Sequence, residues 1–275
     1  MPNSWVRTRK NFRKNKIRTN KIWALANKYN KAEPKIIAIT GSVASGKDFI
    51  AKIFAKNGFV VFDADQEVRN IISNNLQVIE KIAQAFPSAV NNGKISRPEL
   101  GNIVFKGNST EVEQKTQLLE QIIYPELQKF YGEFLNKYRD RPIILNIPLF
   151  FEKANFTADI VISTIAPLKV RRKRFFLREV LKNGNLSLSS QENISFRQNG
   201  KGQKMPLINI NSQNRRVLNA KFFAINATQI NNLERKKLYK DGLIDYLINT
   251  NCSKKRVKTQ ILEIMPDLMK NKPNC

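Results

Sequence analysis

One short stretch constrains the fold of this chain more than any other. Residues Lys35–Ile50 read KIIAITGSVASGKDFI, and they contain the pattern G-x-x-x-x-G-K from Gly41 to Lys47. The apolar run Ile36–Ile39 predicts a short buried strand, and the amphipathic segment 48–56 predicts a helix. A strand, a glycine-rich loop and a helix in this order are the context of a phosphate-binding loop (P-loop).

The pattern favours phosphate binding because of its two glycines and its lysine. Gly41 and Gly46 allow a tight turn that directs backbone N–H groups inward, where the N-terminus of the following helix adds partial positive charge. Lys47 would then reach the β- and γ-phosphates of a nucleotide. We therefore predict a nucleotide-binding site at this loop.

The residue after the lysine departs from the usual pattern. P-loops place Ser or Thr there, whose hydroxyl is a neutral ligand for Mg²⁺, but this chain has Asp48. A carboxylate can also hold Mg²⁺, although it adds negative charge beside a triphosphate. Two interpretations stay open: Asp48 is a metal ligand that weakens nucleotide binding or makes it more metal-dependent, or the site is decayed and inactive.

The composition excludes several classes of function. The chain of 275 residues contains no histidine, so imidazole catalysis and histidine-ligated metal sites are excluded. Two cysteines, Cys252 and Cys275, cannot form a disulfide framework and indicate a reducing compartment. No apolar run approaches the roughly 18 residues of a membrane span. We expect a cytoplasmic monomer.

The formal net charge of +26 raises the question of a nucleic-acid partner. Lysine, asparagine and isoleucine are all abundant, so a general drift in composition also explains the charge. We favour this drift, together with anionic small-molecule substrates, over a nucleic-acid surface. Residues 1–34 carry ten Lys and Arg against one acid, and we interpret them as a solvated, disordered basic extension.

A second buried strand, Phe59–Phe62, ends in two acids, Asp63 and Asp65. Ligands of open α/β sheets bind at the carboxyl ends of the strands, so both acids should face the same crevice as the loop. A carboxylate there can accept the proton of a hydroxyl that attacks a γ-phosphate. We assign Asp63 as this base, and Asp65 as the N-cap of the helix 66–72 or a further acid near the substrate.

Residues 74–138 contain no convincing strand. Helical periodicity covers 76–86, a turn leads into another helix, an apolar stripe precedes Tyr124-Pro125, and a further helix follows. Kinases with a P-loop bind the acceptor substrate in a helical insertion of this kind. Arg97 is a candidate contact for an anionic group there.

Two apolar runs, Ile143–Ile147 and Asp159–Ile165, predict further parallel strands covered on both faces. The helix expected at 168–181 is strongly basic, and its Arg174 and Arg178 share a face. A lid over ATP phosphates requires such a cationic face, because phosphoryl transfer depends mostly on charge stabilisation. An ordinary solvated helix surface is the alternative.

The polar segment 182–219 predicts a flexible inserted loop, because it is rich in Asn, Ser, Gln and Gly. Helical periodicity resumes over 220–238. Residues 245–249 and 257–269 then predict a last strand and a closing helix.

With these residues in hand, the chain resembles the dephospho-CoA kinase family. The P-loop alone is shared by many kinases, but the combination of motifs over about Lys35 to Asp267 is specific. The motifs that carry the resemblance are Ile37–Lys47, Phe62–Asp65, Gly93–Arg97, Leu100–Phe105, Ile123–Pro125, Ile147–Glu152, Ala166–Arg178 and Asp245–Asn249.

The resemblance implies a P-loop kinase fold of the α/β class, with a five-stranded parallel sheet flanked by helices. The kinase domain would span 35–271, with a helical CoA-binding insertion at 75–140 and a lid region at 168–240 that includes the polar insertion. The implied reaction transfers the γ-phosphoryl group of ATP to the 3′-hydroxyl of dephospho-CoA with Mg²⁺, the last step of coenzyme A biosynthesis.

The resemblance also implies roles for single positions. Ala44 to Phe49 fall where the family binds ATP phosphates, Asn249 falls in the segment near the adenine, and Asp63 falls where the family has its base. Residues and resemblance together give these expected site residues: Lys47, Asp63, Arg174 and Arg178 for catalysis; Gly41, Ala44, Ser45, Gly46, Lys47, Asp48, Phe49 and Asn249 for ATP; Asp63, Asp65, Arg97 and Tyr124 for the substrate; Asp48 for the metal.

The chain departs from the family pattern at Asp48, at Tyr124, where the family has His before Pro, and at Ser96, which replaces a common Asp. Two other functions stay open. One is another P-loop kinase that acts on a nucleoside monophosphate, against which the motifs of the helical insertion argue. The other is a catalytically degenerate protein that binds nucleotide or RNA through its basic surface.

Overall fold

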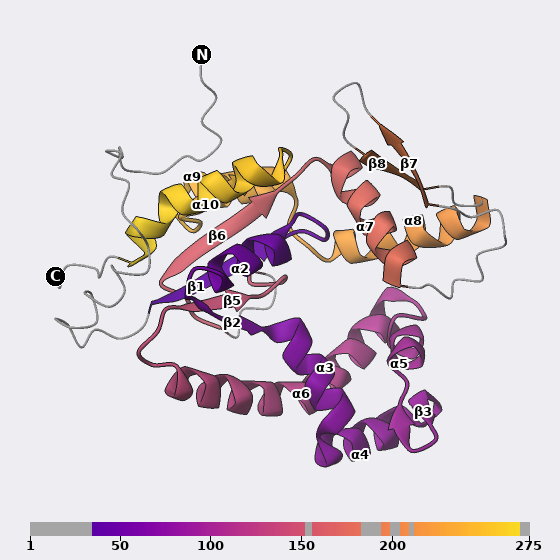
Figure 1. Cartoon of the computed structure of the whole chain (residues 1–275). Helices are drawn as coiled ribbons and strands as arrows, with labels where there is room; N and C mark the ends of the chain where they lie inside the picture. Colours follow the sequence, from indigo (N-terminus) through magenta and orange to yellow (C-terminus); the bar gives the residue numbers. More distant parts are fainter. Residues whose placement is uncertain (1–34, 152–155, 183–193, 199–203, 209–211, 270–275) are drawn as a thin grey trace.

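A computed structural model describes residues 35–151, 156–182, 194–198, 204–208 and 212–269 (Figure 1). The basic extension expected at 1–34 lies outside the described residues, and so does Glu152 of one family motif. No helix in the described part of the chain has the length and apolar character needed to cross a membrane.

Five parallel strands form the central sheet, as the resemblance implies, and their order is β2-β5-β1-β6-β9. β1 lies in the middle because its residues are apolar on both faces: Ile37, Ala38 and Ile39 are all fully buried. The strands are β1 (Ile36–Gly41), β2 (Val60–Asp63), β5 (Ile143–Asn146), β6 (Ile160–Ile165) and β9 (Tyr246–Asn249).

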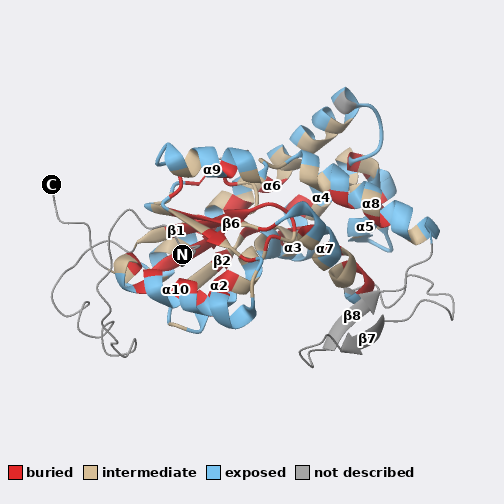
Figure 2. Cartoon of the chain, turned by 90° about the horizontal axis from the view of Figure 1, so that it is seen from above, coloured by how far each residue is buried: buried red, intermediate tan, exposed pale blue. Residues whose placement is uncertain are grey.

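Helices cover both faces of this sheet (Figure 2). Successive strand residues point to opposite faces, so Ile37 and Ile39 pack against one helical layer and Ala38 packs against the other. The first layer consists of α2 (Lys47–Ala55) and α10 (Lys254–Met269). The second consists of α3 (Ala64–Asn74), α6 (Ser109–Lys137) and α9 (Asn232–Lys240).

The helical insertion between β2 and β5 differs from the expectation at one point. We expected a break at Tyr124-Pro125, but α6 runs through Pro125 without interruption. Ile123 and Leu127, on either side of the proline, are buried in the core, and this packing compensates for the lost backbone hydrogen bond. The other elements are α4 (Leu76–Ala85), η1 (Pro87–Ala89), β3 (Val90–Asn91), β4 (Lys94–Ile95) and α5 (Arg97–Val104).

The region after β6 is more regular than its composition predicts. After α7 (Leu168–Lys182), an antiparallel hairpin forms from β7 (Ile194–Gln198) and β8 (Lys204–Ile208), and α8 (Ser212–Ala227) begins before residue 220. The expectation of a loop over 182–219 is therefore wrong for these segments. α7 and α8 pack together through aromatic and aliphatic side chains, which the polar neighbours obscure in the sequence: Phe175, Val180, Leu218 and Phe222.

The single helix expected at 220–238 is also wrong. The chain leaves the helical path after α8 and starts again at α9, because Asn231 forms a capping box with Glu234. Figure 1 shows α7, α8 and the hairpin projecting together beyond the carboxyl edge of the sheet.

A methyl group at Gly41 tests how tightly β1 fits its neighbours. A Cβ there would collide with Thr164 Oγ1 and Ser45 Oγ, so we expect Gly41→Ala to lower the free energy of unfolding by about 1–3 kcal/mol. Gly132→Ala is the control, since a Cβ there meets nothing within 4 Å and alanine favours helix α6. Denaturant unfolding followed by circular dichroism measures both. Equal stability of the two variants would contradict the close packing.

Candidate active site at the carboxyl edge of the sheet

The P-loop connects β1 to α2. Gly46 forms the N-cap of α2 with a φ of 102°, a left-handed conformation that glycine adopts without steric cost. Ala44 is also left-handed, with a φ of 57°, which is uncommon for a residue that has a Cβ. The loop therefore ends at a helix N-terminus, whose partial positive charge attracts anions.

Neighbouring strands hold the loop in place. Ser45 Oγ and Thr164 Oγ1 share a buried hydrogen bond of 2.5 Å, and Thr250 Oγ1, just after β9, donates to Ser45 O. Phe49 N donates to Gly46 O at 3.1 Å, and the Phe49 side chain packs against the core around α2 and α10. Phe49 thus contributes to the start of the helix.

The segment between α8 and α9 contacts the loop as well. Val43 N donates to Gln229 Oε1 at 2.6 Å, and Ser42 Oγ donates to Ile230 O at 3.1 Å. Both segment residues fall within the helix expected at 220–238, so these contacts could not be predicted from the sequence. They join the region around α7 and α8 directly to the P-loop.

Two buried arginines place positive charge beside the loop. Arg171 of α7 is 3% exposed and Arg235 of α9 is 0% exposed. Arg171 Nη1 donates to Val43 O at 3.4 Å, and Arg235 Nε donates to Ser42 Oγ at 3.4 Å. Burial lowers the pKa of Arg171, but a guanidinium remains charged at neutral pH.

A line of polar side chains joins the loop to the end of β2. Lys47 Nζ lies 2.8 Å from Asp48 Oδ1, and Asn146 Nδ2 donates to the same oxygen at 3.2 Å. Asn146 Nδ2 also donates to Asp63 Oδ2 at 2.9 Å. One amide therefore holds both carboxylates, and Lys47 and Asp63 lie at the same edge of the sheet.

Asp48 is ionised among these hydrogen-bonded side chains. Desolvation raises the pKa of Asp48, but the charge of Lys47, hydrogen bonds from Lys47 and Asn146, and the charge of Arg178 outweigh it, so the net shift is downward. Its side chain keeps 55% of its surface exposed, whereas that of Lys47 keeps 13%.

Asp63 and Asp65 have different surroundings. Asp63 is the N-cap of α3, since its Oδ1 accepts a hydrogen bond from Gln66 N at 3.0 Å, so the assignment of the cap to Asp65 is wrong. Asp65 lies in the first turn of α3 at the protein surface. Desolvation by nearby protein atoms and the charges of Asp63 and Asp48 raise its pKa, while Lys47 and Arg69 oppose the shift.

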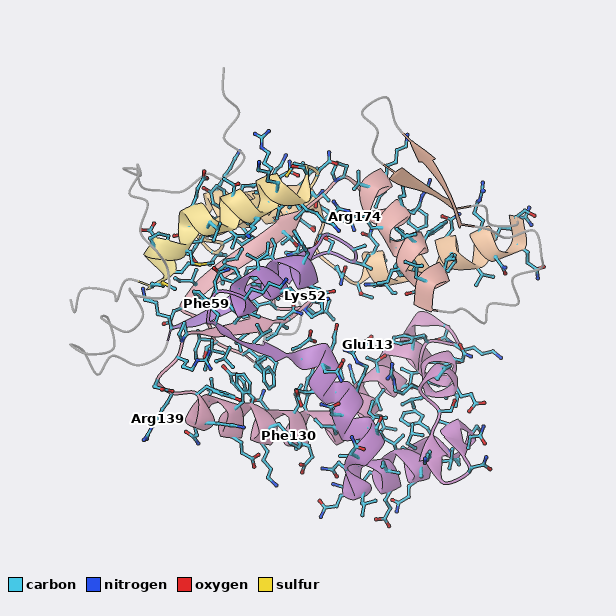
Figure 3. All side chains as sticks on the ribbon, in the orientation of Figure 1. Lys52, Phe59, Glu113, Phe130, Arg139 and Arg174 are labelled. Carbon is cyan, nitrogen blue, oxygen red and sulfur yellow. The ribbon has the colours of Figure 1, made fainter. Side chains whose placement is uncertain are left out.

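The two arginines expected in the lid make different contacts. Arg174, labelled in Figure 3, donates from Nη1 to Thr250 Oγ1 at 2.9 Å and from Nη2 to Thr250 O at 2.7 Å. Arg178 stacks on the Phe175 ring at 5.3 Å, and its Nε lies 3.6 Å from Glu179 Oε1. Its charge also contributes to the lowered pKa of Asp48. Arg174 is thus hydrogen-bonded to Thr250 just after β9, whereas Arg178 contacts Phe175 and Glu179 of its own helix.

Three expected residues lie further along the chain. Asn249 ends β9 and its Oδ1 accepts from Asn251 N at 2.9 Å, next to the Thr250 that contacts the loop. Arg97 opens α5 at an exposed position, and Tyr124 is half-buried against the core of the helical insertion. Their roles in binding stay predictions.

Asn146 is a site residue that was not predicted from the sequence. The signal was one polar residue at the end of an otherwise apolar strand, directly before the Ile147-Pro148 pair. Asn146 is 1% exposed, and its Oδ1 is a buried oxygen that has no hydrogen-bond partner. Asp48, Asp63 and Asn146 together offer hard oxygen donors, although the described residues contain no cluster of three or more His, Cys, Asp or Glu that could hold a metal ion.

The loop, the parallel sheet and the carboxylates at its edge define a P-loop kinase. A crystal structure of TT1252 from Thermus thermophilus shares this fold, with a TM-score of 0.63 and 22% identity, and the match covers 87% of this chain and 100% of that one.

The family model of dephospho-CoA kinase matches residues 35–215. The dephospho-CoA kinase of Bartonella quintana is 29% identical over 241 residues, which cover 86% of this chain and 100% of that protein. The dephospho-CoA kinase of Fusobacterium nucleatum is 35% identical over 147 residues, 52% of this chain and 73% of that protein. The chain belongs to the dephospho-CoA kinase family, whose members are kinases of the final step of coenzyme A biosynthesis.

Loss of the Asp48 charge should show in the pH dependence of stability. The folded-state pKa is below the ordinary value of 3.8, so ionised Asp48 stabilises the fold above that pH, and the contribution is lost as pH falls through the lowered pKa. We expect Asp48→Asn to melt about 1–3 °C below the parent protein at pH 7 and to match it in strong acid. Asp241→Asn, at an exposed helix end, is the control. A difference that grows on acidification would contradict this result.

Substitutions of Arg174 and Arg178 in α7 should have different effects on stability and on turnover. We expect Arg174→Ala to lower the melting temperature by about 4–8 °C, because two charged hydrogen bonds to Thr250 are lost. Arg178→Ala should leave the melting temperature nearly unchanged and lower kcat by about 10- to 100-fold. Calorimetry and steady-state kinetics on both variants measure this, and the opposite pattern would assign the lid role to Arg174.

Proposed function

We propose that this protein transfers the γ-phosphoryl group of ATP to the 3′-hydroxyl of dephospho-CoA, giving coenzyme A and ADP. The observation that carries the proposal is the pair of carboxylates, Asp48 and Asp63, joined by the Asn146 amide beside Lys47. A phosphate donor at the loop and a hydroxyl at Asp63 would meet at this edge of the sheet.

Asp63 is suited to accept the proton of the acceptor hydroxyl. Each of its oxygens accepts one hydrogen bond, from Gln66 N and from Asn146 Nδ2, and a carboxylate offers about four acceptor positions in all. The two bonds fix the orientation of the carboxylate, so a free lone pair can face the hydroxyl. Asp65, with its raised pKa, is a further acid near the substrate.

Lys47 and the N-terminus of α2 would bind the β- and γ-phosphates. Three further cations, Arg171, Arg178 and Arg235, lie around the loop or act on it, and they offset the charge of a triphosphate. This positive charge also balances the Asp48 carboxylate.

Mg²⁺ is the cofactor that we propose, and the residues fit it. Asp48 supplies a partly exposed carboxylate and Asn146 supplies a buried oxygen without a partner, while ATP phosphates complete the coordination of Mg²⁺ in such enzymes. The ion would neutralise charge on the transferring phosphoryl group. We further propose that Arg97 and Tyr124 contact dephospho-CoA, that Asn249 lies near the adenine of ATP, and that the protein is a cytoplasmic monomer.

A direct assay tests the function. Purified protein with ATP, Mg²⁺ and dephospho-CoA should yield ADP and coenzyme A in equal amounts by liquid chromatography, with little turnover when AMP replaces dephospho-CoA. Lys47→Ala should lower kcat/KM by at least about 100-fold. Lys52→Ala is the matched control, because Lys52 is exposed on the same helix (Figure 3).

Three outcomes would contradict the proposal. No coenzyme A would indicate a degenerate site, and phosphorylation of AMP would indicate a nucleoside monophosphate kinase. Retained activity of Lys47→Ala would remove the P-loop from the mechanism.

A further inference from the structure

The contact between Asp48 and Asn146 joins two positions that P-loop enzymes use to hold Mg²⁺. In the usual arrangement, the Ser or Thr after the loop lysine supplies a neutral hydroxyl, and an aspartate at the end of a neighbouring strand supplies a negative charge. Here the residue after Lys47 is the carboxylate.

Asn146 occupies the strand-end position. β5 is the neighbour of β1 in the sheet, and Asn146 is its last residue, in register with Ile39 of β1 and with Asp63 of β2. The 3.2 Å hydrogen bond from Asn146 Nδ2 to Asp48 Oδ1 shows that the two positions are close enough to act on one ion. The neutral group and the charged group have therefore exchanged places.

We infer that Asp48 and Asn146 form one metal-binding pair with exchanged chemistry, in which the helix supplies the carboxylate and the strand supplies the neutral oxygen. The inference rests on the proposed use of a divalent ion with ATP, and it assigns to Asn146 a role in the binding of that ion. The formal charge of the pair is the same as in the usual arrangement, so the carboxylate at position 48 adds no net charge to the site.

The exchange is electrostatically reasonable because the two positions differ in exposure. Asn146 is 1% exposed, so a charge there would be almost fully desolvated, and it would lie within hydrogen-bonding distance of Asp63. More than half of the Asp48 side-chain surface is exposed to solvent, and Asp48 lies in the first turn of α2, where the helix dipole favours an anion. The charge thus occupies the better solvated position.

The amide serves the pair in two orientations. With Nδ2 toward the carboxylates, as in this structure, Asn146 relieves the repulsion between Asp48 and Asp63. Its Oδ1 is buried without a partner, and rotation of the amide would place this oxygen between the carboxylates when a cation balances their charge. An aspartate or a leucine at position 146 could not do both.

Mn²⁺ binding to the protein with ADP tests the pair without any need for turnover. Electron paramagnetic resonance titration would give the Mn²⁺ dissociation constant for the parent protein, for Asp48→Ser, and for Asp48→Ser combined with Asn146→Asp. We expect Asp48→Ser to bind Mn²⁺ about tenfold more weakly, and the double variant, which restores the usual arrangement, to bind within about threefold of the parent. Asp241→Ser, remote from the P-loop in sequence and exposed, is the control and should bind as the parent does.

Two results would overturn the inference. Unchanged Mn²⁺ affinity in Asp48→Ser would remove the carboxylate from the metal site. A double variant that is unfolded by circular dichroism, or that binds no better than Asp48→Ser, would show that positions 48 and 146 are not exchangeable.

Asn146→Asp alone, which places a third carboxylate beside Asp48 and Asp63, should melt below the double variant. Failure of the assay with dephospho-CoA, with this binding pattern intact, would overturn the proposed function alone.

Discussion

The amide of Asn146 is the contact on which the site depends. It donates to both Asp48 and Asp63, two carboxylates that would otherwise repel each other at the ends of neighbouring elements. Lys47 Nζ lies 2.8 Å from Asp48 Oδ1, so the lysine of the P-loop belongs to the same group of hydrogen-bonded side chains. The sheet brings these groups together through its strand order, in which β5 separates β1 from β2 and presents Asn146 between them.

The loop is also held by contacts from α7, α9 and the segment between α8 and α9. Gln229 and the buried Arg171 and Arg235 contact the backbone or hydroxyl groups of Ser42 and Val43. Buried cations are costly unless their hydrogen bonds are made, and here they are directed at the segment that would carry phosphate. α7 and α9 are therefore joined to the P-loop through these side chains.

Much of the fold could be predicted from local pattern. The apolar runs, the last predicted strand at 245–249 and the G-x-x-x-x-G-K spacing are short-range signals, and the five strands of the central sheet formed where these signals placed them. The errors arose where packing overrides composition. α6 continues through Pro125 because the core holds both sides of it, and α8 begins inside a polar segment because Leu218 and Phe222 pack on α7.

Site residues could be predicted where they belong to the P-loop motif or to the end of a predicted strand. The placement of Asp63 near the loop followed from the rule that ligands bind at the carboxyl ends of strands. Gln229 and Arg235 are far from the loop in sequence, and no pattern showed that they would reach it. Asn146 gave only a weak signal, as the polar last residue of an apolar strand. The division of roles between Asp63 and Asp65 at the start of α3 also required the backbone geometry.

A crystal structure of the protein with ADP and Mn²⁺, with anomalous scattering to locate the metal, would show whether Asp48 and Asn146 bind the ion. We predict an anomalous peak in direct contact with a carboxylate oxygen of Asp48, with the Asn146 amide oxygen turned toward it. A metal ion bound by the phosphates alone, with Asp48 still paired to Lys47 and Asn146, would contradict the account.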